Sequence, residues 1–453
     1  MKKTLLIILL LFCCDEIKAQ MVFGSWEKIN KKKLTNKAED NSNTPKVEGL
    51  KDLGSDTYPS PRSGAMTWKD NDGNFWIFGG IGTDSKKKIG AFNDLWKFDT
   101  KARTFQLIKG ERFTEKQAPQ AQKNVEKATN TPSGRRDAAN WVDKDGNLWL
   151  YGGRSMDDFT IYDDMWMFNI KKGNWILASD NRKLNAVSKT DKKGEAKNSN
   201  APGSRSGSTT WTDINGNLWL FGGLVLENSK KTSGYYNDLW KYNTKTNIWV
   251  WVAGGKNPNS KQIKEVKKNG AESADDTPSG RNTAIGWVDK SGEKLWLYGG
   301  YGIDNKVQTT GGLSDMWFFN IKKNVWRWHS GPLTFYEKAN QEISGLESPK
   351  ATPGFRYGAV GWTDKSGDLW LFGGQSKFSK DTVVINNDLW KFNPKTERWT
   401  SVLANGGPPI IHSAQGFVDD KDAFWLFSGV FINNRLNYQV SNDLWKFTLT
   451  KQL

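Results

Sequence analysis

The sequence predicts an all-β protein, a six-bladed β-propeller whose last blade is closed by a strand from the N-terminus. Three observations predict this fold. A long phrase recurs six times, each copy divides into four short strands, and the last copy lacks its fourth strand. Self-similarity at a fixed period is typical of repeat architectures, in which each unit buries its apolar face against its neighbours. The 453 residues therefore form one closed domain after an N-terminal leader, although length alone would suggest two or three domains.

The first half of each copy runs from an arginine to a tryptophan six residues later, and then to a pair of glycines. We expect one strand from the arginine to the tryptophan, a tight turn rich in Asp, Asn and Gly, and a second strand that the glycines end. The sixth copy is weaker and has Ile411 in the arginine position. The arginines of the other five copies are Arg62, Arg135, Arg205, Arg281 and Arg356.

The second half of each copy supplies two further strands. It contains Asp, then Leu or Met, then Trp, and in five copies another aromatic residue follows nine positions later. The aspartates of the five copies that also hold the arginine are Asp94, Asp164, Asp238, Asp315 and Asp388. Turns such as residues 70–73 resemble calcium-binding loops, but they lack the glutamate that such a loop needs at its end. We therefore expect ordinary turns and no metal site.

The sixth copy stops before its fourth strand. The aromatic residue of that strand would fall one position after Leu453, whereas residues 24–29 resemble a fourth strand that has no first three. A strand from the N-terminus that completes the last blade closes the ring and removes an exposed sheet edge. We therefore expect residues 20–57 to supply the outer strand of blade 6, and residues 58–453 to form the six blades.

Residues 1–19 are typical of a secretory signal peptide. Lys2 and Lys3 precede an apolar run that is too short to span a bilayer as a helix, and small residues follow near a cleavage point. Lipid attachment at Cys13 or Cys14 is the alternative, although the residue before each is bulkier than lipoprotein processing usually accepts. No comparable apolar run follows. We expect an exported protein, periplasmic or extracellular, without a transmembrane segment.

Composition excludes several chemistries. Both cysteines lie in the signal peptide, so the mature chain has no disulfide, thiolate nucleophile or thiolate metal site. His329 and His412 are its two imidazoles. The net charge of +16 is spread along the chain without a stripe of basic and aromatic residues, so we expect no nucleic-acid partner.

The repeated glycine pair, the aromatic residue before it, the Asp-Leu-Trp phrase and the final tryptophan resemble kelch repeats. The resemblance covers roughly residues 22–453. It implies a propeller, and many kelch propellers are interaction scaffolds. Propellers of this kind also include radical-copper sugar oxidases and a six-bladed sialic acid mutarotase. The oxidase chemistry needs a cysteine bonded to a tyrosine and histidine copper ligands, and this chain lacks that set, so we expect no cofactor.

Strand direction places the long connections on one face. The links between second and third strands, and between successive blades, are long and share a face, which is where a propeller normally binds. The repeated arginines begin the first strands on that face. They could grip an anion, but each has an aspartate of the same blade as a ready partner. We favour a structural arginine–aspartate pair in each of the five blades.

Positions that break the repeat are better ligand candidates than positions that keep it. The two positions after the arginine vary from copy to copy. Their polar and aromatic members predict a pocket at the mouth of the channel, and ordinary drift at half-exposed positions is the alternative. The candidates are Arg136, Asp137, Asn282, Tyr357 and His412.

The sequence thus favours an exported, non-catalytic binding or scaffold propeller that engages a glycan or a protein through its long-loop face. The alternative is a mutarotase- or epimerase-like enzyme acting on an acidic sugar, in which Arg136 holds a carboxylate and Asp137 or His412 moves a proton. That alternative is an analogy of fold. The identity of the ligand and the oligomeric state stay open.

Overall fold

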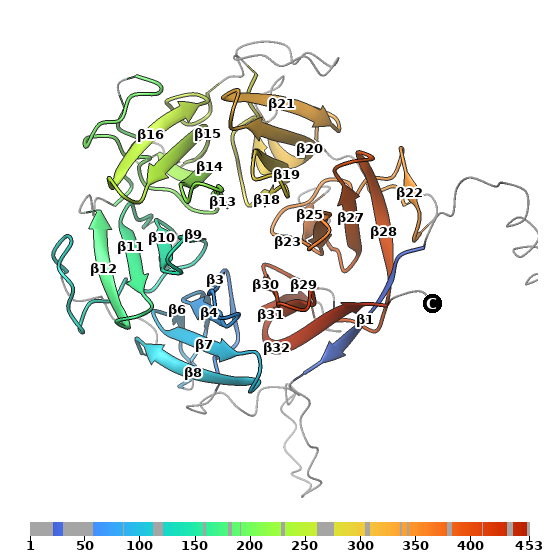
Figure 1. Ribbon diagram of the computed structural model, residues 1–453, viewed down its shortest axis with the longest axis horizontal. Helices are drawn as coiled ribbons and strands as arrows, with labels where there is room; N and C mark the ends of the chain where they lie inside the picture. The colour runs from blue at the N-terminus through green and yellow to red at the C-terminus, as the bar shows by residue number, and fades with distance from the viewer. Residues whose placement is uncertain are drawn as a thin grey trace, which may run out of the picture.

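The structure of the chain is a computed structural model. It describes residues 21–29, 58–84, 86–111, 121–156, 160–179, 184–190, 192–227, 232–260, 276–303, 309–335, 338–341, 344–377, 383–409, 411–432 and 438–450. These residues contain no helix and form six four-stranded blades around a central axis (Figure 1). The six-bladed propeller that the sequence predicts is confirmed. The predicted signal peptide, residues 1–19, lies outside the described residues.

Each blade is an antiparallel sheet whose first strand lies nearest the axis (Figure 1). Blade 1 consists of β3 (Met66–Lys69), β4 (Phe75–Phe78), β7 (Leu95–Asp99) and β8 (Thr104–Lys109), and blade 2 of β9 (Ala139–Val142), β10 (Leu148–Tyr151), β11 (Met165–Asn169) and β12 (Asn174–Ser179). Blade 3 consists of β13 (Thr209–Thr212), β14 (Leu218–Glu227), β15 (Thr232–Asn243) and β16 (Ile248–Ala253), and blade 4 of β18 (Ile285–Val288), β19 (Lys294–Ile303), β20 (Thr310–Asn320) and β21 (Val325–Ser330). Blade 5 consists of β23 (Val360–Thr363), β24 (Leu369–Phe372), β27 (Leu389–Asn393) and β28 (Arg398–Asn405), and blade 6 of β30 (Gln415–Val418), β31 (Phe424–Ile432), β32 (Tyr438–Leu449) and β1.

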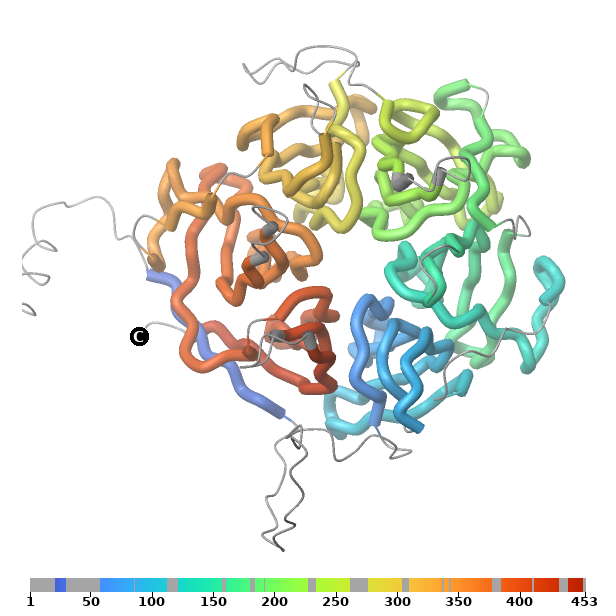
Figure 2. Tube along the Cα trace, turned by 180° about the vertical axis from the view of Figure 1, so that it is seen from behind, coloured from blue at the N-terminus to red at the C-terminus, as the bar shows by residue number. Residues whose placement is uncertain are grey.

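The N-terminal strand β1 (Phe23–Lys28) closes the ring. It pairs antiparallel with β32, in a register that sets Trp26 opposite Phe447. Its first residues also pair in parallel with β28 of blade 5, where Phe23 faces Leu403. Both views show β1 along the outer edge of blades 5 and 6 (Figures 1 and 2). One strand therefore completes blade 6, covers the edge of β32 and ties the blade to blade 5.

The core lies between neighbouring blades, and tryptophans dominate it. The first-strand tryptophan of one blade reaches the second strand of the next and donates its indole N–H to a backbone carbonyl there. Trp68 donates to the carbonyl of Trp149 at 3.1 Å, and Trp141 donates to that of Trp219 at 2.8 Å. In blade 6 the position belongs to Phe417, which stacks on Phe75 of blade 1 at 3.4 Å between centroids. Each such residue buries a large apolar surface and fixes the angle between two blades.

The sequence predicts one continuous first strand in each repeat, but in the structure this strand is broken. In blade 1, β2 (Arg62–Ser63) precedes Gly64, which has a φ of +65°, and β3 begins at Met66. The short pieces β17 (Arg281–Asn282) and β29 (Ile411–His412) precede the same break in blades 4 and 6. A residue with positive φ turns the chain out of the extended conformation, so the arginine segment is offset from the rest of the first strand. It stays in its own blade, where β17 pairs with β19 and β29 pairs with β31 beyond the bend of the second strand.

In blades 1, 2 and 5 the second strand ends just before the glycine pair, as the sequence predicts. In blades 3, 4 and 6 the strand bends at this point and continues, contrary to the prediction. In blade 3, Gly222 and Gly223 have φ values of +68° and +108°, the register shifts there, and β14 continues to Glu227 opposite β15. The strands β19 and β31 continue in the same way. In blades 1 and 5 a short pair follows instead, β5 (Ile81–Thr83) with β6 (Ile89–Ala91) and β25 (Gln375–Lys377) with β26 (Val383–Ile385). We call these paired connections between second and third strands the hairpin arms.

Candidate functional site

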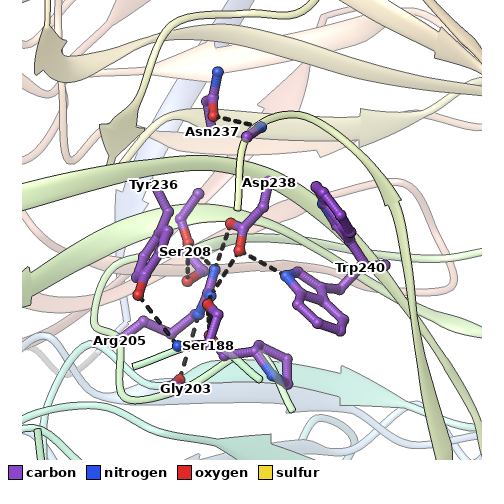
Figure 3. Close-up of polar contacts among 12 residues, drawn as sticks. Ser188, Gly203, Arg205, Ser208, Tyr236, Asn237, Asp238 and Trp240 are labelled. Atoms are coloured by element: carbon purple, nitrogen blue, oxygen red, sulfur yellow. Dashed lines mark hydrogen bonds and ion pairs between the residues drawn. The ribbon is translucent and has the colours of Figure 1, made fainter. Parts of the chain in front are cut away.

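The repeated arginine lies inside its blade, bound by the repeated aspartate. In blade 3, Arg205 donates from Nη1 and Nη2 to the two carboxylate oxygens of Asp238 at 2.8 and 2.9 Å (Figure 3). The indole of Trp240 donates to the same carboxylate at 2.7 Å, and the guanidinium stacks 4.3 Å from the ring centroid of Tyr236. Nη1 also donates to the carbonyl of Gly222, the first glycine of the pair. The arginine therefore fastens the first strand, the glycine bend and the third strand together.

The same arrangement occurs in the other four blades that carry the arginine. The exposed fraction of each arginine is 0 or 1%. Burial alone would raise the pKa of Asp388, but the charge of Arg356 and the hydrogen bonds from Arg356 and Trp390 lower it below its ordinary value. A guanidinium buried inside a blade and bound to its aspartate is not presented to an anion in the channel. The pairs, at 2.5–2.7 Å, are Arg62 with Asp94, Arg135 with Asp164, Arg281 with Asp315 and Arg356 with Asp388.

Blade 6 replaces this cluster with a closing ion pair. Ile411 is buried where the arginine stands elsewhere, and Asp443 instead receives Lys28 Nζ from β1 at 2.8 Å. The side chains of Lys28 and Asp443 are 35% and 27% exposed, so this pair is more hydrated than those of the other blades. The strand that closes the ring thus also supplies the cation that its last blade lacks.

A ring of backbone hydrogen bonds joins the six blades at the axis. It passes through the residue two positions after the arginine, which has a φ between +50° and +69° in every blade. Each of these residues donates its N–H to the carbonyl of the equivalent residue in the preceding blade, at 2.7–3.4 Å, and the sixth bond closes the circle. We call these residues the inner ring: Gly64, Asp137, Gly207, Thr283, Gly358 and Ser413.

Glycine and non-glycine residues alternate around the inner ring. Glycine adopts positive φ without cost, whereas an L-residue pays on the order of 1–2 kcal/mol, and the φ of +50° at the β-branched Thr283 is unusual. Space explains the alternation. A Cβ on Gly64 would lie 2.5 Å from Oδ1 of Asp137, and one on Gly207 would lie 3.1 Å from Cγ2 of Thr283. Each non-glycine side chain leans over the glycine before it, so the ring has room for three side chains.

Strained residues of this kind cluster at functional sites. The inner ring bears its strain at Asp137, Thr283 and Ser413, in alternate blades. The residues directly before the ring, and those directly after the glycine pairs, surround it on the side of the hairpin arms. We call this region the ring mouth.

Blade 2 places two arginines beside one strained carboxylate in the ring mouth. Arg154, just after the glycine pair, pairs with the backbone of Arg136 and donates from Nε and Nη2 to Oδ2 of Asp137 at 3.3 and 3.2 Å. Nη1 of Arg136 lies 3.8 Å from the same oxygen. About one fifth of each of the three side chains is exposed. Two guanidiniums thus lie beside one carboxylate at the ring mouth.

Blade 4 adds buried polar atoms. The carboxamide oxygen of Asn282 and the hydroxyl of Thr283 are buried, and neither has a hydrogen-bond partner among the described residues. Such atoms are rare because each leaves its desolvation uncompensated. Both oxygens lie beside the ring mouth, so a ligand hydroxyl or a water molecule there would supply the hydrogen-bond partner that each lacks among the described residues.

Blades 5 and 6 contribute an aromatic ring and an imidazole. Tyr357 contacts Tyr301 of the blade 4 hairpin arm, with centroids 5.4 Å apart. His412 Nδ1 lies 3.0 Å from the hydroxyl of Ser413, its inner-ring neighbour. Burial lowers the pKa of His412 to about 4, so the imidazole is neutral at physiological pH and able to accept a proton.

The five sequence candidates all lie around the same ring, but only Arg136 and Asp137 are adjacent. Asn282, Tyr357 and His412 stand in the next blades round, each at the position before its inner-ring residue. Sequence reasoning missed Arg154 and Tyr301. Both follow a glycine pair, at a position occupied by Ile81, Leu224, Gln375 and Val430 in the other blades. The same search for positions that break the repeat would have found them.

A separate cavity of about 490 Å³ lies at the opposite end of the channel, among the second halves of the first strands. Its polar side chains mostly bind neighbouring backbone. Asn140 donates to the carbonyl of Thr67 at 2.7 Å, and Thr212 donates to that of Val142 at 3.2 Å. The lining of this cavity is chemically plainer than the ring mouth, since among the side chains that line it Lys69 alone is ionisable and it pairs with Asp420. The ring mouth is therefore the stronger candidate.

The turns that resemble calcium loops are stabilised from within. Oδ1 of Asp70 accepts the N–H groups of Asp72 and Asn74 at 3.0 and 2.8 Å, and Oδ2 accepts the indole of Trp76. Within the described part of the chain, no group of three or more His, Cys, Asp or Glu side chains is arranged to hold a metal ion. That part also holds no helix with the length and apolarity that crossing a bilayer requires.

The chain is similar to a group of curated proteins over about half of its length. No protein-family model matches the chain. The chain is 27% identical to N-acetylneuraminate epimerase of Escherichia coli O1:K1 / APEC over 247 aligned residues. The aligned span covers 52% of this chain and 60% of that protein. Proteins of the same name from Escherichia coli O157:H7 and strain K12 are 28% and 27% identical over the same span. The chain thus matches about 60% of the length of these curated relatives. The likeness agrees with the β-propeller fold, and the kelch repeat stays a resemblance.

Proposed function

We propose that this protein binds a carboxylated sugar of the sialic acid class at the ring mouth. The observation that carries the proposal is the cluster of Arg136 and Arg154 around Asp137, in which the backbone of Asp137 is strained and all three side chains are partly exposed. Arginine pairs with carboxylates through parallel N–H···O bonds, and such charge-assisted bonds are roughly twice as strong as neutral ones. The named activity of the relatives, on N-acetylneuraminate, supports the same ligand class.

The rest of the ring mouth suits the hydroxyls of such a sugar. The oxygens of Asn282 and Thr283, which have no partner among the described residues, gain one when a ligand hydroxyl or amide approaches. The carboxylate of Asp137 is a second acceptor, held in place by Arg154. The two arginines of the ring mouth are both in blade 2. We therefore expect this blade to distinguish an acidic sugar from a neutral one.

A second candidate function is exchange of the sugar anomers. One observation favours it. His412, neutral because of burial, and Asp137 flank blade 1, whose residues there are the small Ser63 and Gly64. One of these groups accepts the proton of the anomeric hydroxyl and returns it, directly or through water, to the ring oxygen. The ring C–O bond then breaks to give the open-chain ketone, and closure on the other face reverses both transfers.

Export completes the proposal. Residues 1–19 are proposed as a cleaved signal peptide, which would place the ring mouth outside the cytoplasm, where acidic glycans are met. Sequencing the N-terminus of the protein recovered from the envelope and from the medium tests this point. A first residue near Gln20 supports cleavage, and a lipid-modified Cys13 or Cys14 would replace it with an anchored protein.

Calorimetric titration with N-acetylneuraminic acid and with its methyl ester tests the binding. We expect the acid to bind more tightly than the ester, and Arg136→Ala to weaken the acid by about tenfold or more, equal to about 1.4 kcal/mol, with little effect on the ester. Thr210→Val, in the opposite cavity, is the matched control and should change neither. If Thr210→Val reduces binding and Arg136→Ala does not, the site lies at the other end of the channel.

Proton exchange spectroscopy on the same samples tests the second candidate. Faster exchange between the two anomers of the free sugar on adding protein, lost in His412→Asn and Asp137→Asn, would establish catalysis. Binding without any change in the exchange rate would establish a binding protein.

A further inference from the structure

A row of tyrosines leads away from the arginines along one side of the ring mouth. Tyr235 stands in β15 of blade 3, Tyr301 in β19 of blade 4, and Tyr357 before β23 of blade 5. Neighbouring ring centroids are 6.2 Å apart between Tyr235 and Tyr301, and 5.4 Å apart between Tyr301 and Tyr357. Consecutive blades thus form one connected aromatic surface.

The row begins at the arginine cluster. Tyr235 belongs to blade 3, which adjoins blade 2 and its two arginines. Burial and the neighbouring Tyr301 raise the pKa of Tyr235 to about 12, and the charge of Arg154 opposes them. Tyr235 is 7% exposed and supports Tyr301 from behind. Tyr301 and Tyr357 are themselves partly exposed. An acidic group bound at blade 2 therefore has an exposed aromatic surface on one side of it.

A single sugar does not use the whole of this surface. Blades 2 and 5 stand opposite each other in a ring of six, and Tyr301 lies on a hairpin arm beyond the inner ring. A monosaccharide whose carboxylate is held by Arg136 and Arg154 lies at blade 2, two blades from Tyr301 and three from Tyr357. The tyrosines then remain for whatever is attached to it.

Building on the proposed function, we infer that the ligand is a sialylated oligosaccharide. The acidic sugar occupies Arg136 and Arg154, and the sugar linked to it packs on Tyr301 and Tyr357. Aromatic rings suit this role because they present an apolar face and, in tyrosine, a hydroxyl at the edge. The Tyr301 hydroxyl lies 3.4 Å from Oγ1 of Thr310 across the hairpin arm, so it is oriented as well as exposed.

This ligand also separates the two candidate functions. A sialic acid in glycosidic linkage has no free anomeric hydroxyl, so it can be bound but its anomers cannot be exchanged. Preference for the linked sugar therefore favours a binding protein over a mutarotase.

Calorimetric titration of the full-length mature protein with N-acetylneuraminic acid, 3′-sialyllactose and lactose tests the inference. We expect sialyllactose to bind about tenfold more tightly than the free acid, and lactose to bind weakly or not at all. Tyr301→Ala should reduce sialyllactose to the affinity of the free acid and leave the free acid unchanged. Tyr301→Phe, which keeps the ring, should retain most of the preference. Thr210→Val, in the cavity at the opposite end of the channel, is the control outside the ring mouth and should change nothing.

The outcomes are distinguishable from those of the proposed function. Equal affinity for sialyllactose and the free acid, both lost in Arg136→Ala, overturns the oligosaccharide and keeps the acidic-sugar site. Preference for sialyllactose that survives Tyr301→Ala and Tyr357→Ala overturns the tyrosine surface. Absence of binding to both sugars overturns the inference together with the proposed function.

Discussion

Arg135 and Arg136 are neighbours in the sequence and have opposite environments. Arg135 is fully buried, and its guanidinium makes two hydrogen bonds to Asp164 at 2.5 and 2.9 Å. About one fifth of Arg136 is exposed at the ring mouth, where its guanidinium lies 3.8 Å from Asp137. The first arginine recurs in five blades, and the second occurs in blade 2 alone. The repeat builds the blade, and the departure from it builds the candidate site.

The reason is geometrical. The chain reverses its local conformation at the inner ring, so a residue before the break and a residue next to it project into different surroundings. A position inside the blade must satisfy the same carboxylate, indole and carbonyl each time, so it does not vary. A position at the ring mouth meets only the axis, so each blade is free to place a different group there.

The largest expected effect is the difference in the free energy of unfolding between the Arg135→Ala and Arg136→Ala variants. Arg135→Ala leaves the carboxylate of Asp164 buried without its cation, and we expect a loss of about 3–5 kcal/mol in the free energy of unfolding. Arg136→Ala should change it by about 0.5 kcal/mol or less, since its charge is partly hydrated. Urea unfolding followed by tryptophan fluorescence measures both. Equal losses would mean that the exposed arginine is structural too.

The sequence predicted the fold, the blade boundaries and the closing strand because these depend on repetition. Six copies of one phrase constrain strand order, and a copy without a fourth strand requires one from elsewhere. Arg136 and Asp137 were found by the same logic, as positions that differ between copies. Residues that share a motif position can be compared across copies even when only one sequence is known.

The break in the first strand and the hairpin arms were not predictable in this way. An extended strand and a strand with one residue at positive φ have the same apolar pattern, and Asp137, Thr283 and Ser413 give no sign of positive φ as a glycine would. Strand continuation past a glycine pair depends on pairing with the next strand, which pattern alone does not show. The sequence pattern did not reveal Arg154 and Tyr301 for this reason. Both directly follow a glycine pair, where the pattern predicts the end of the second strand.

An intermediate effect is expected for the pH dependence of the free energy of unfolding, to which His412 contributes. His412 lies at the ring mouth, whereas the other histidine, His329, lies at the edge of its blade. The pKa of His412, about 4, is below the ordinary value near 6.5, so the unfolded chain takes up the proton first as the pH falls. This contribution favours folding above pH 6.5 and is lost between pH 6.5 and 4, on the order of 1–3 kcal/mol. In the His412→Asn variant, the unfolding free energy should fall less steeply over that window.

The chain has two histidines, so NMR titration of the imidazole protons resolves both, and His412→Asn assigns them. Burial lowers the pKa of His329 as well, with Glu397 opposing it. Only His412 lies at the ring mouth, so only its titration should shift when an acidic sugar is added. A pKa near 6.5 for His412 would mean that the ring mouth is more hydrated than its burial indicates.

The alternation of the inner ring gives the smallest expected effect and tests whether its strain is structural or is retained for the site. Gly64→Ala brings a Cβ to 2.5 Å from Oδ1 of Asp137 at a positive φ, and we expect a loss of about 1–2 kcal/mol in unfolding free energy. Asp137→Gly relieves strain and should cost little or stabilise slightly, while weakening the binding of an acidic sugar. Combined with Asp137→Gly, Gly64→Ala should cost less than it does alone, because the carboxylate that it meets is gone. Additive losses would place the cost in the backbone of Gly64 alone, and the alternation would then reflect φ rather than crowding.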